Sequence, residues 1–236
     1  VLISIKPTVG DELSPITKAR IIDEILKPYN IVAITPEILS PDYLYVLVKS
    51  NIKYNKALTS KSAGEISAVV EDAITAQFTA DLKEFGSVLR YSRLISAIDS
   101  SEDAISSNIT TVEMSRRFRQ EEANTSGIYE LPYYNALIPG TIVSSTIVKT
   151  GGNEFALMDD GLGKMTLYNI TTSGFENTDI GEVDYTSGKV SLAGFTTDID
   201  DNQVISMYGA PVDTDISSNK NLLVLFDSAV IETTAI

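Results

Sequence analysis

The sequence predicts an α+β protein, with a ferredoxin-like (split βαβ) domain over residues 1–122 followed by an all-β sandwich or barrel domain over residues 127–236. Two observations lead to this prediction. In the first half, apolar residues follow strand and helix periods in the order strand–helix–strand–strand–helix–helix–strand. After Gly127 the helical period disappears, and apolar runs are separated by clusters of Gly, Asn, Asp and Ser. The polar stretch 119–127 is the predicted joint between the domains.

The first elements alternate between strand and helix. Residues 2–5 are predicted to form a strand. Ser14 followed by Pro15 is a good helix start, because a hydroxyl cap precedes a proline at the first helical position. An apolar stripe at helical spacing then runs to Pro28, which ends the helix, and residues 30–35 form the second predicted strand.

Residues 43–54 carry the clearest strand pattern, because their side chains alternate strictly between two faces. The apolar face consists of Leu44, Val46, Val48, Ile52 and Tyr54, and the polar face of Lys49, Asn51 and Lys53. We therefore expect helices to cover the first face and water to reach the second.

A long helix is predicted over residues 62–85, with apolar residues at helical spacing and Gly86 as its C-terminal stop. A shorter helix over 92–98 and a strand over 108–118 complete the first half. In the second half we expect strands in the apolar runs 141–148, 154–158, 165–170, 181–193, 203–208 and 221–231. Within 181–194 we expect a tight hairpin with the three-residue turn 186–188, because Gly188 at its end supplies the positive φ that the turn requires.

The composition restricts the possible chemistry. The chain has no histidine, cysteine or tryptophan, which excludes disulfides and every catalytic or metal site that needs imidazole or thiolate. The formal net charge is −14; residues 1–126 have 14 basic and 17 acidic side chains, and residues 127–236 have 4 and 15. So acidic a surface disfavours nucleic acid and membranes as partners, and the longest apolar run, 222–226, is too short to span a bilayer. The sequence starts with valine in a strand-like run, which we interpret as a fragment or a processed product.

Three possible sites were considered, and none predicts a catalytic, cofactor-binding or metal-binding residue. Asp198, Asp200 and Asn202 imitate the start of a calcium loop, but its glycine and its final glutamate are missing, so we expect a solvated turn. Residues 158–165 contain glycines and a lysine without the spacing of a phosphate-binding loop, and we expect a hairpin turn there. Paired carboxylates could serve a glycosidase, but nothing singles out one pair.

Three tyrosines near the joint are the candidate interface residues. Tyr129, Tyr133 and Tyr134 lie close together beside a proline, and clustered tyrosines supply the rigid amphipathic area that interfaces use. The alternative is that they pack the two domains against each other.

The order of segments resembles the baseplate J-like family of contractile phage tails. The residues that carry the resemblance are a Pro–Tyr–alternating-apolar strand, a glycine turn after a helix, and a short helix with a Ser-x-Leu element: Pro41, Tyr43, Val46, Val48, Gly86, Ser92 and Leu94. The resemblance covers about residues 28–118, and the hairpin 181–192 is similar to turns in phage structural proteins. Within the family, the chain looks most like large wedge subunits of T-even-type phages.

The resemblance implies a structural, non-enzymatic protein of the virion, assembled in the host cytoplasm and without a cofactor. Its expected partners are other baseplate wedge subunits and further copies of itself, in a dimer or a ring around the tail hub that changes when the tail contracts. The polar joint 119–127 is a candidate hinge for that change. Two other classes stay open on the residues alone: a β-rich receptor- or glycan-binding module, suggested by the acidic β half, and a carboxylate hydrolase.

Overall fold

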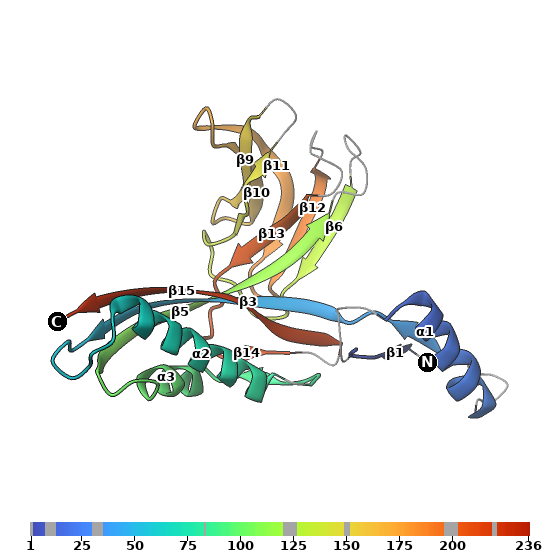
Figure 1. Cartoon of the computed structure of the whole chain (residues 1–236). Coiled ribbons are helices and arrows are strands. Elements are labelled where there is room, and N and C mark those ends of the chain that lie inside the picture. The colour runs from blue at the N-terminus through green and yellow to red at the C-terminus, as the bar shows by residue number, and fades with distance from the viewer. Residues whose placement is uncertain are drawn as a thin grey trace.

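The computed structural model describes residues 2–7, 13–29, 35–82, 84–119, 127–148, 152–195, 203–218 and 221–236. They form a mixed α+β structure in which strands predominate. Figure 1 shows a long, narrow layer of strands with helices beneath it, a curled sheet that rises above it, and a small N-terminal unit at one end.

The N-terminal unit is small and has little interior. Strands β1 (Leu2–Ser4) and β2 (Glu37–Leu39) pair in parallel as a separate two-stranded sheet. Between them the chain forms helix α1 (Pro15–Arg20), which widens into a π-helical turn (η1, Ile21–Leu26) and tightens into a 3-10 turn (η2, Lys27–Tyr29). Ser14 caps α1 as expected, because its Oγ accepts a hydrogen bond from the amide of Thr17 at 3.2 Å. No residue of these helical turns is buried.

Three strands make up the long layer: β3 (Asp42–Tyr54), β5 (Ile105–Arg119) and β15 (Leu222–Ala235). β3 lies in the middle, antiparallel to β5 and parallel to β15. The predicted alternation in β3 is confirmed, because Leu44, Val46, Val48, Ile52 and Tyr54 are buried while Lys49, Asn51 and Lys53 are exposed.

Two helices cover the apolar face of this layer (Figure 1). α2 (Ala63–Asp81) begins at Ser62, whose side chain and that of Glu65 form a reciprocal capping box. It ends four residues before the predicted position, and Gly86 lies in the following turn with φ +76°. The N-terminus of α3 (Tyr91–Asp99) is capped by a residue far away in the sequence, because Oδ1 of Asp215 accepts a hydrogen bond from the amide of Tyr91 at 2.9 Å. Beside it, β4 (Val88–Leu89) pairs with β14 (Ile216–Ser217) in a second small sheet.

The remaining strands continue the main sheet away from β5 and curl it into a half-barrel. The described residues form one 11-stranded sheet in the order β15-β3-β5-β13-β7-β9-β10-β11-β12-β6, with β8 paired to β9. The strands of the half-barrel are β6 (Gly127–Pro132), β7 (Val143–Ser144), β8 (Ile147–Val148), β9 (Glu154–Asp159), β10 (Lys164–Asn169), β11 (Gly174–Asp184), β12 (Lys189–Phe195) and β13 (Val204–Gly209). A single hydrophobic core runs from beneath the long layer into the half-barrel.

The predicted ferredoxin-like domain is not found. That arrangement needs all four strands of the first half in one sheet, but β1 and β2 pair only with each other. Both sides of β3 are occupied, one by β5 and the other by β15 from the end of the chain. The predicted strand 30–35 lies mostly outside the described residues.

The predicted all-β second half consists of strands, as expected, but they do not form a sheet of their own. β13 pairs with β5 and β15 pairs with β3, so strands from both sides of the predicted boundary share one sheet. The boundary itself falls on residues 120–126, which are outside the described ranges, and the division into domains 1–122 and 127–236 stays a prediction.

Two predicted hairpins are confirmed. β11 and β12 pair up to Asp184↔Lys189, with Gly188 in the turn at φ +64°; the turn has four residues where three were expected. β9 and β10 are joined by the glycine-containing turn around Asp160, whose Oδ1 accepts the amides of Leu162 at 2.7 Å and Lys164 at 2.9 Å. The amide of Lys164 and then that of Leu162 hold the pKa of Asp160 below its usual value.

Candidate interaction surface

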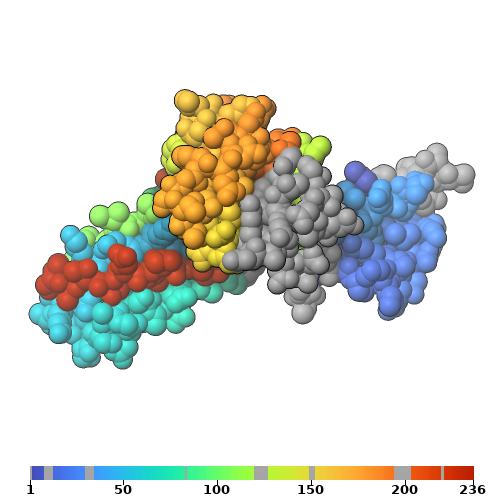
Figure 2. Space-filling view, turned by 90° about the horizontal axis from the view of Figure 1, so that it is seen from above, coloured from blue at the N-terminus to red at the C-terminus, as the bar shows by residue number. Residues whose placement is uncertain are grey.

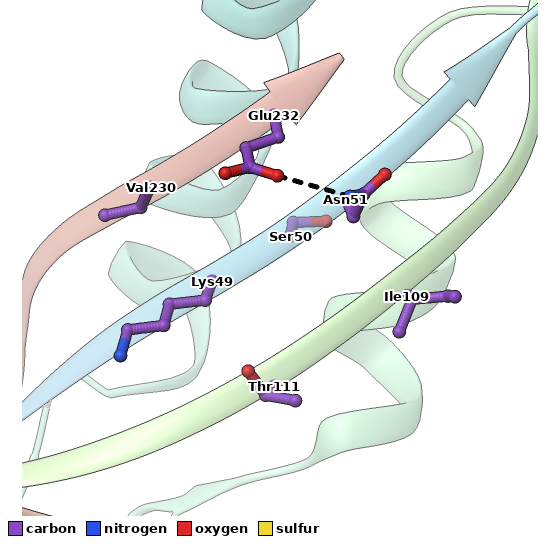
Figure 3. Close-up of a pocket in the computed structure, with 7 residues that line it drawn as sticks. All are labelled: Lys49, Ser50, Asn51, Ile109, Thr111, Val230 and Glu232. Atoms are coloured by element: carbon purple, nitrogen blue, oxygen red, sulfur yellow. Dashed lines mark hydrogen bonds between the residues drawn. The ribbon is translucent and has the colours of Figure 1, made fainter. Parts of the chain in front are cut away.

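The face of the long layer opposite α2 and α3 is open, and we call it the open face. It is formed by side chains of β3, β5 and β15, with a shallow depression of about 260 Å³ in the middle. Figure 3 shows the residues that line this depression: Lys49, Ser50, Asn51, Ile109, Thr111, Val230 and Glu232. In Figure 1 the open face lies beside the half-barrel, which rises from the same side of the layer.

Strand alternation assigns side chains to the two faces of the layer. Lys49 is paired with Thr111 on one side and with Val230 on the other, so these three side chains lie side by side across the open face. One residue further along, Ser50 and Thr110 lie under the sheet, where their hydroxyls share a buried hydrogen bond of 2.7 Å. The helices cover that side, and the open face is left to the solvent.

The charged groups around the depression have polar partners on the neighbouring strand. Nζ of Lys49 is 2.6 Å from Oε1 of Glu113 on the neighbouring strand. Nδ2 of Asn51 donates to Oε2 of Glu232 on the other side at 3.3 Å. In a chain of net charge −14, this face holds acidic side chains next to a basic one and an amide donor. Its charge therefore repels other acidic surfaces less than the rest of the chain does.

Two large apolar side chains are exposed on this face. Ile109 on β5 is 70% exposed and Val230 on β15 is 51% exposed. They line opposite sides of the depression, with Lys49 and Asn51 between them (Figure 3). Apolar groups rimmed by satisfied polar groups are typical of surfaces that bind another protein.

A second polar cluster crosses the three strands further along the layer. The guanidinium of Arg117 on β5 lies 3.8 Å from the ring centroid of Tyr45 on β3. The same guanidinium pairs with the carboxylate of Asp227, at the bulge of β15. These contacts tie the edge strand β15 to β5 across β3.

The three predicted interface tyrosines have different surroundings. Tyr133 is wholly buried, and its hydroxyl donates to the main-chain oxygen of Met207 at 2.6 Å. Tyr129 packs against the core, with its ring centroid 4.9 Å from that of Phe118. Tyr134 is 43% exposed and has a positive φ of 57°, which residues other than glycine rarely adopt. The packing of Tyr133 and Tyr129 corresponds to the alternative role in internal packing, and an interface role for the group stays a prediction.

The open face itself was not predicted as a site. The alternation in β3 indicates a wet face, but Ile109 and Val230 belong to strands whose pairing with β3 is not visible in the sequence. The one local signal is that Ile109 alternates in phase with polar residues of its strand such as Thr111 and Arg117, which places it on the same, exposed face.

The described residues offer little for other kinds of site. Among them, no three acidic side chains come together in a group that could hold a metal ion. The calcium-like residues Asp198, Asp200 and Asn202 lie outside the described ranges. Within those ranges, none of the helices combines the length and the apolarity needed to cross a membrane.

Comparison of the chain with known proteins finds similarity to a baseplate protein of phage tails. Residues 42–117 match the family described as baseplate structural protein gp6, C-terminal domain III, and residues 1–39 match C-terminal domain I of the same protein. The two matches meet where the small β1–β2 sheet ends and β3 begins. The baseplate wedge protein gp6 of Enterobacteria phage T4 is 26% identical over 213 residues, which cover 87% of this chain. The chain spans 30% of the length of that relative.

The chain is thus a structural, non-enzymatic protein of a contractile phage tail, part of the baseplate and so of the virion. More particularly, residues 42–117 and 1–39 are similar to C-terminal domains III and I of the baseplate wedge protein gp6, a baseplate J-like wedge subunit. The predicted resemblance is confirmed.

Proposed function

We propose that this chain acts in the wedge through contacts with other baseplate proteins and with copies of itself, in a dimer or a ring around the tail hub. The observation that carries the proposal is the open face, where Ile109 and Val230 are exposed among polar groups. The two side chains line the same depression, and apolar groups gathered among polar ones are typical of surfaces that bind another protein.

The N-terminal unit adds a second surface suited to contacts. Its helical turns bury no residue, and Ile16, Ile25 and Tyr29 are all largely exposed, Tyr29 by 87%. Four of the five charged side chains on these helical turns pair with each other, Arg20 with Glu24 and Lys27 with Asp23. The fifth, Lys18, donates from Nζ to Oγ of Ser40 at 2.9 Å. Its exposed apolar side chains are therefore the groups through which this unit contacts another protein.

A wedge subunit that accommodates tail contraction needs rigid parts and adjustable joints. We assign the rigid part to the continuous 11-stranded sheet, because strands from both halves of the chain pair with each other in it. The polar stretch 119–127 is the proposed joint, on its composition alone.

Light scattering of the purified chain, alone and mixed with other wedge subunits, tests the proposal. We expect a mass above the 25.6 kDa of one chain at high concentration, and a further rise when wedge subunits are added. A strict monomer that ignores every wedge subunit, at high concentration and low salt, would contradict it.

A further inference from the structure

The outer edge of β15 is a further surface of the molecule, distinct from the open face and from the N-terminal unit. β15 pairs with β3 from Leu222↔Asp42 to Ala235↔Tyr54, and it is the terminal strand of the sheet among the described residues. In Figure 2 its later part (red) runs along one arm of the molecule, with the teal atoms of α2 beside it. An edge of this length presents a row of main-chain donors and acceptors to the solvent.

The pairing identifies which main-chain groups point outward. The amide of Ile236 donates to the oxygen of Tyr54 at 2.9 Å, so residue 236 faces β3. Because main-chain groups alternate along a strand, those of Ile231, Thr233 and Ala235 point away from β3. These three residues offer amides and carbonyls at the spacing that a further strand needs.

The later part of β15 has few of the devices that protect an edge. Natural edge strands are blocked by charged side chains (lysine above all), by proline, by a bulge, by a covering helix or loop, or by a short length. Residues 222–235 contain no proline, lysine or arginine. The bulge between Phe226 and Ser228 lies towards the beginning of the strand and leaves the later part in regular pairing.

Charge indicates what kind of segment would pair with this edge. β15 carries Asp227 and Glu232, and α2, which packs beside it, carries four acidic residues and no basic one. Asp81 and Asp227 have arginine partners, Arg93 and Arg117. Together, β15 and α2 have six acidic side chains and no basic one, and this excess of negative charge favours an incoming strand with lysine or arginine. A second copy of β15 would bring the same acidic residues against it, which opposes self-pairing.

A hollow beside the edge offers a place for an apolar side chain. It has a volume of about 230 Å³ and lies beside the first part of β15. Its lining comes from Phe78 and Thr79 of α2, from Leu82 just after that helix, from Val224, Leu225 and Phe226 of β15, and from Lys6. The rings of Phe78 and Phe226 form its aromatic wall, with their centroids 4.9 Å apart. In strand addition, main-chain hydrogen bonds supply affinity, and such hollows supply specificity.

We propose that the outer edge of β15 binds an extended, basic segment of another protein as an additional strand. The main-chain groups of Ile231, Thr233 and Ala235 form the ladder, and the acidic border selects lysine or arginine in the incoming strand. This inference goes beyond the wedge contacts proposed above, because it concerns a different surface and a specific mode of recognition.

Peptide binding to the whole chain tests the proposal. The probe is a short capped peptide of alternating lysine and isoleucine, and its counterpart has glutamate in place of lysine. We expect the lysine peptide to bind and to slow hydrogen exchange at the amides of Ile231, Thr233 and Ala235, and the glutamate peptide to bind at least about tenfold more weakly. Methylating every second amide nitrogen of the lysine peptide removes the hydrogen-bond donors along one of its two edges. Methylation of the even-numbered or of the odd-numbered amides blocks opposite edges, and one of the two patterns should abolish binding.

A pair of variants isolates the edge. Thr233→Pro removes one outward amide without touching the ladder to β3, and should weaken the lysine peptide about tenfold. Thr233→Val keeps the amide and serves as the control, and both variants are checked for an unchanged circular dichroism spectrum. Equal binding to Thr233→Pro and Thr233→Val overturns the proposal, as does equal binding of the two peptides or no binding of the lysine peptide at millimolar concentration. Light scattering with wedge subunits is a separate readout, so this proposal and the proposed function can fail independently.

Discussion

The hydroxyl of Tyr133 donates a 2.6 Å hydrogen bond to the main-chain oxygen of Met207, and both residues are completely buried. The bond connects the segment after β6 to β13, two parts of the half-barrel that are far apart in sequence. Burial raises the pKa of Tyr133 well above its ordinary value, so the hydroxyl remains a donor throughout the physiological range.

Tyr133→Phe is expected to lower the free energy of unfolding by about 1–3 kcal/mol, because it removes a buried hydrogen bond and leaves the oxygen of Met207 without this donor. Chemical denaturation measures the change. Tyr134→Phe is the control, since Tyr134 is partly exposed and should change stability by less than about 0.5 kcal/mol. Equal effects of the two variants would show that the buried bond contributes nothing.

Gly188→Ala is expected to be costly for two reasons. Gly188 has φ +64°, and a Cβ there would lie 1.9 Å from the main-chain oxygen of Asn135. Strain and overpacking together predict a loss of about 2–5 kcal/mol in the free energy of unfolding. Gly86→Ala is the matched control, because Gly86 has φ +76° with nothing within 4 Å of the added Cβ. It should show the strain alone, about 1–2 kcal/mol, and a loss as large as that of Gly188→Ala would argue against the contact with Asn135.

The hydroxyl of Tyr185 is expected to ionise at an unusually high pH. Burial, together with a 2.9 Å hydrogen bond to Asp159, raises its pKa to about 12. Because the folded pKa lies above the unfolded value of about 10, this contribution to stability is complete below about pH 10 and is lost as the pH rises through 12. Tyrosinate absorbance of the wild type minus that of Tyr185→Phe should isolate one transition near pH 12. A difference curve centred near pH 10 would be inconsistent with the bond.

The N-terminus of α2 should become less stable in acid. The amide of Ser62 and then its hydroxyl, each bound to Oε2 of Glu65, lower the pKa of this carboxyl below its usual value. The contribution is present above the unfolded pKa of about 4.3 and is lost as the pH falls through the folded pKa. Thermal unfolding from neutral pH towards pH 3 should therefore show a larger decrease for the wild type than for Glu65→Gln, whose amide does not titrate. Parallel decreases would contradict this.

The local features of the fold could be predicted because they leave local patterns. The alternation from Leu44 to Tyr54 reflects a strand with one face on helices, and Gly188 reflects a turn with positive φ. Strand pairing leaves no such trace. β15 and β3 are separated by most of the chain, and nothing in either run indicates that they are neighbours. The ferredoxin-like prediction failed for this reason, since an order of elements does not determine which strands pair.

The candidate site could be predicted only in part for the same reason. Lys49 and Asn51 were placed on a wet face, since their own strand shows the pattern. Ile109 and Val230 join them only through strand pairing. The tyrosines near the joint were predicted from their spacing, and spacing alone does not distinguish the buried Tyr133 from the exposed Tyr134.

Ile109→Ser tests the role of the open face in assembly. Ile109 is 70% exposed, so the change should alter the free energy of unfolding by no more than about 0.5 kcal/mol. If the open face binds other copies or wedge subunits, loss of this side chain should weaken assembly, seen as a lower mass by light scattering at the same concentration. Leu162→Ser is the matched control, because Leu162 is 89% exposed but belongs to the β9–β10 turn, away from this face. Equal masses for the two variants would mean that assembly uses another surface, such as the exposed side chains of the N-terminal helix.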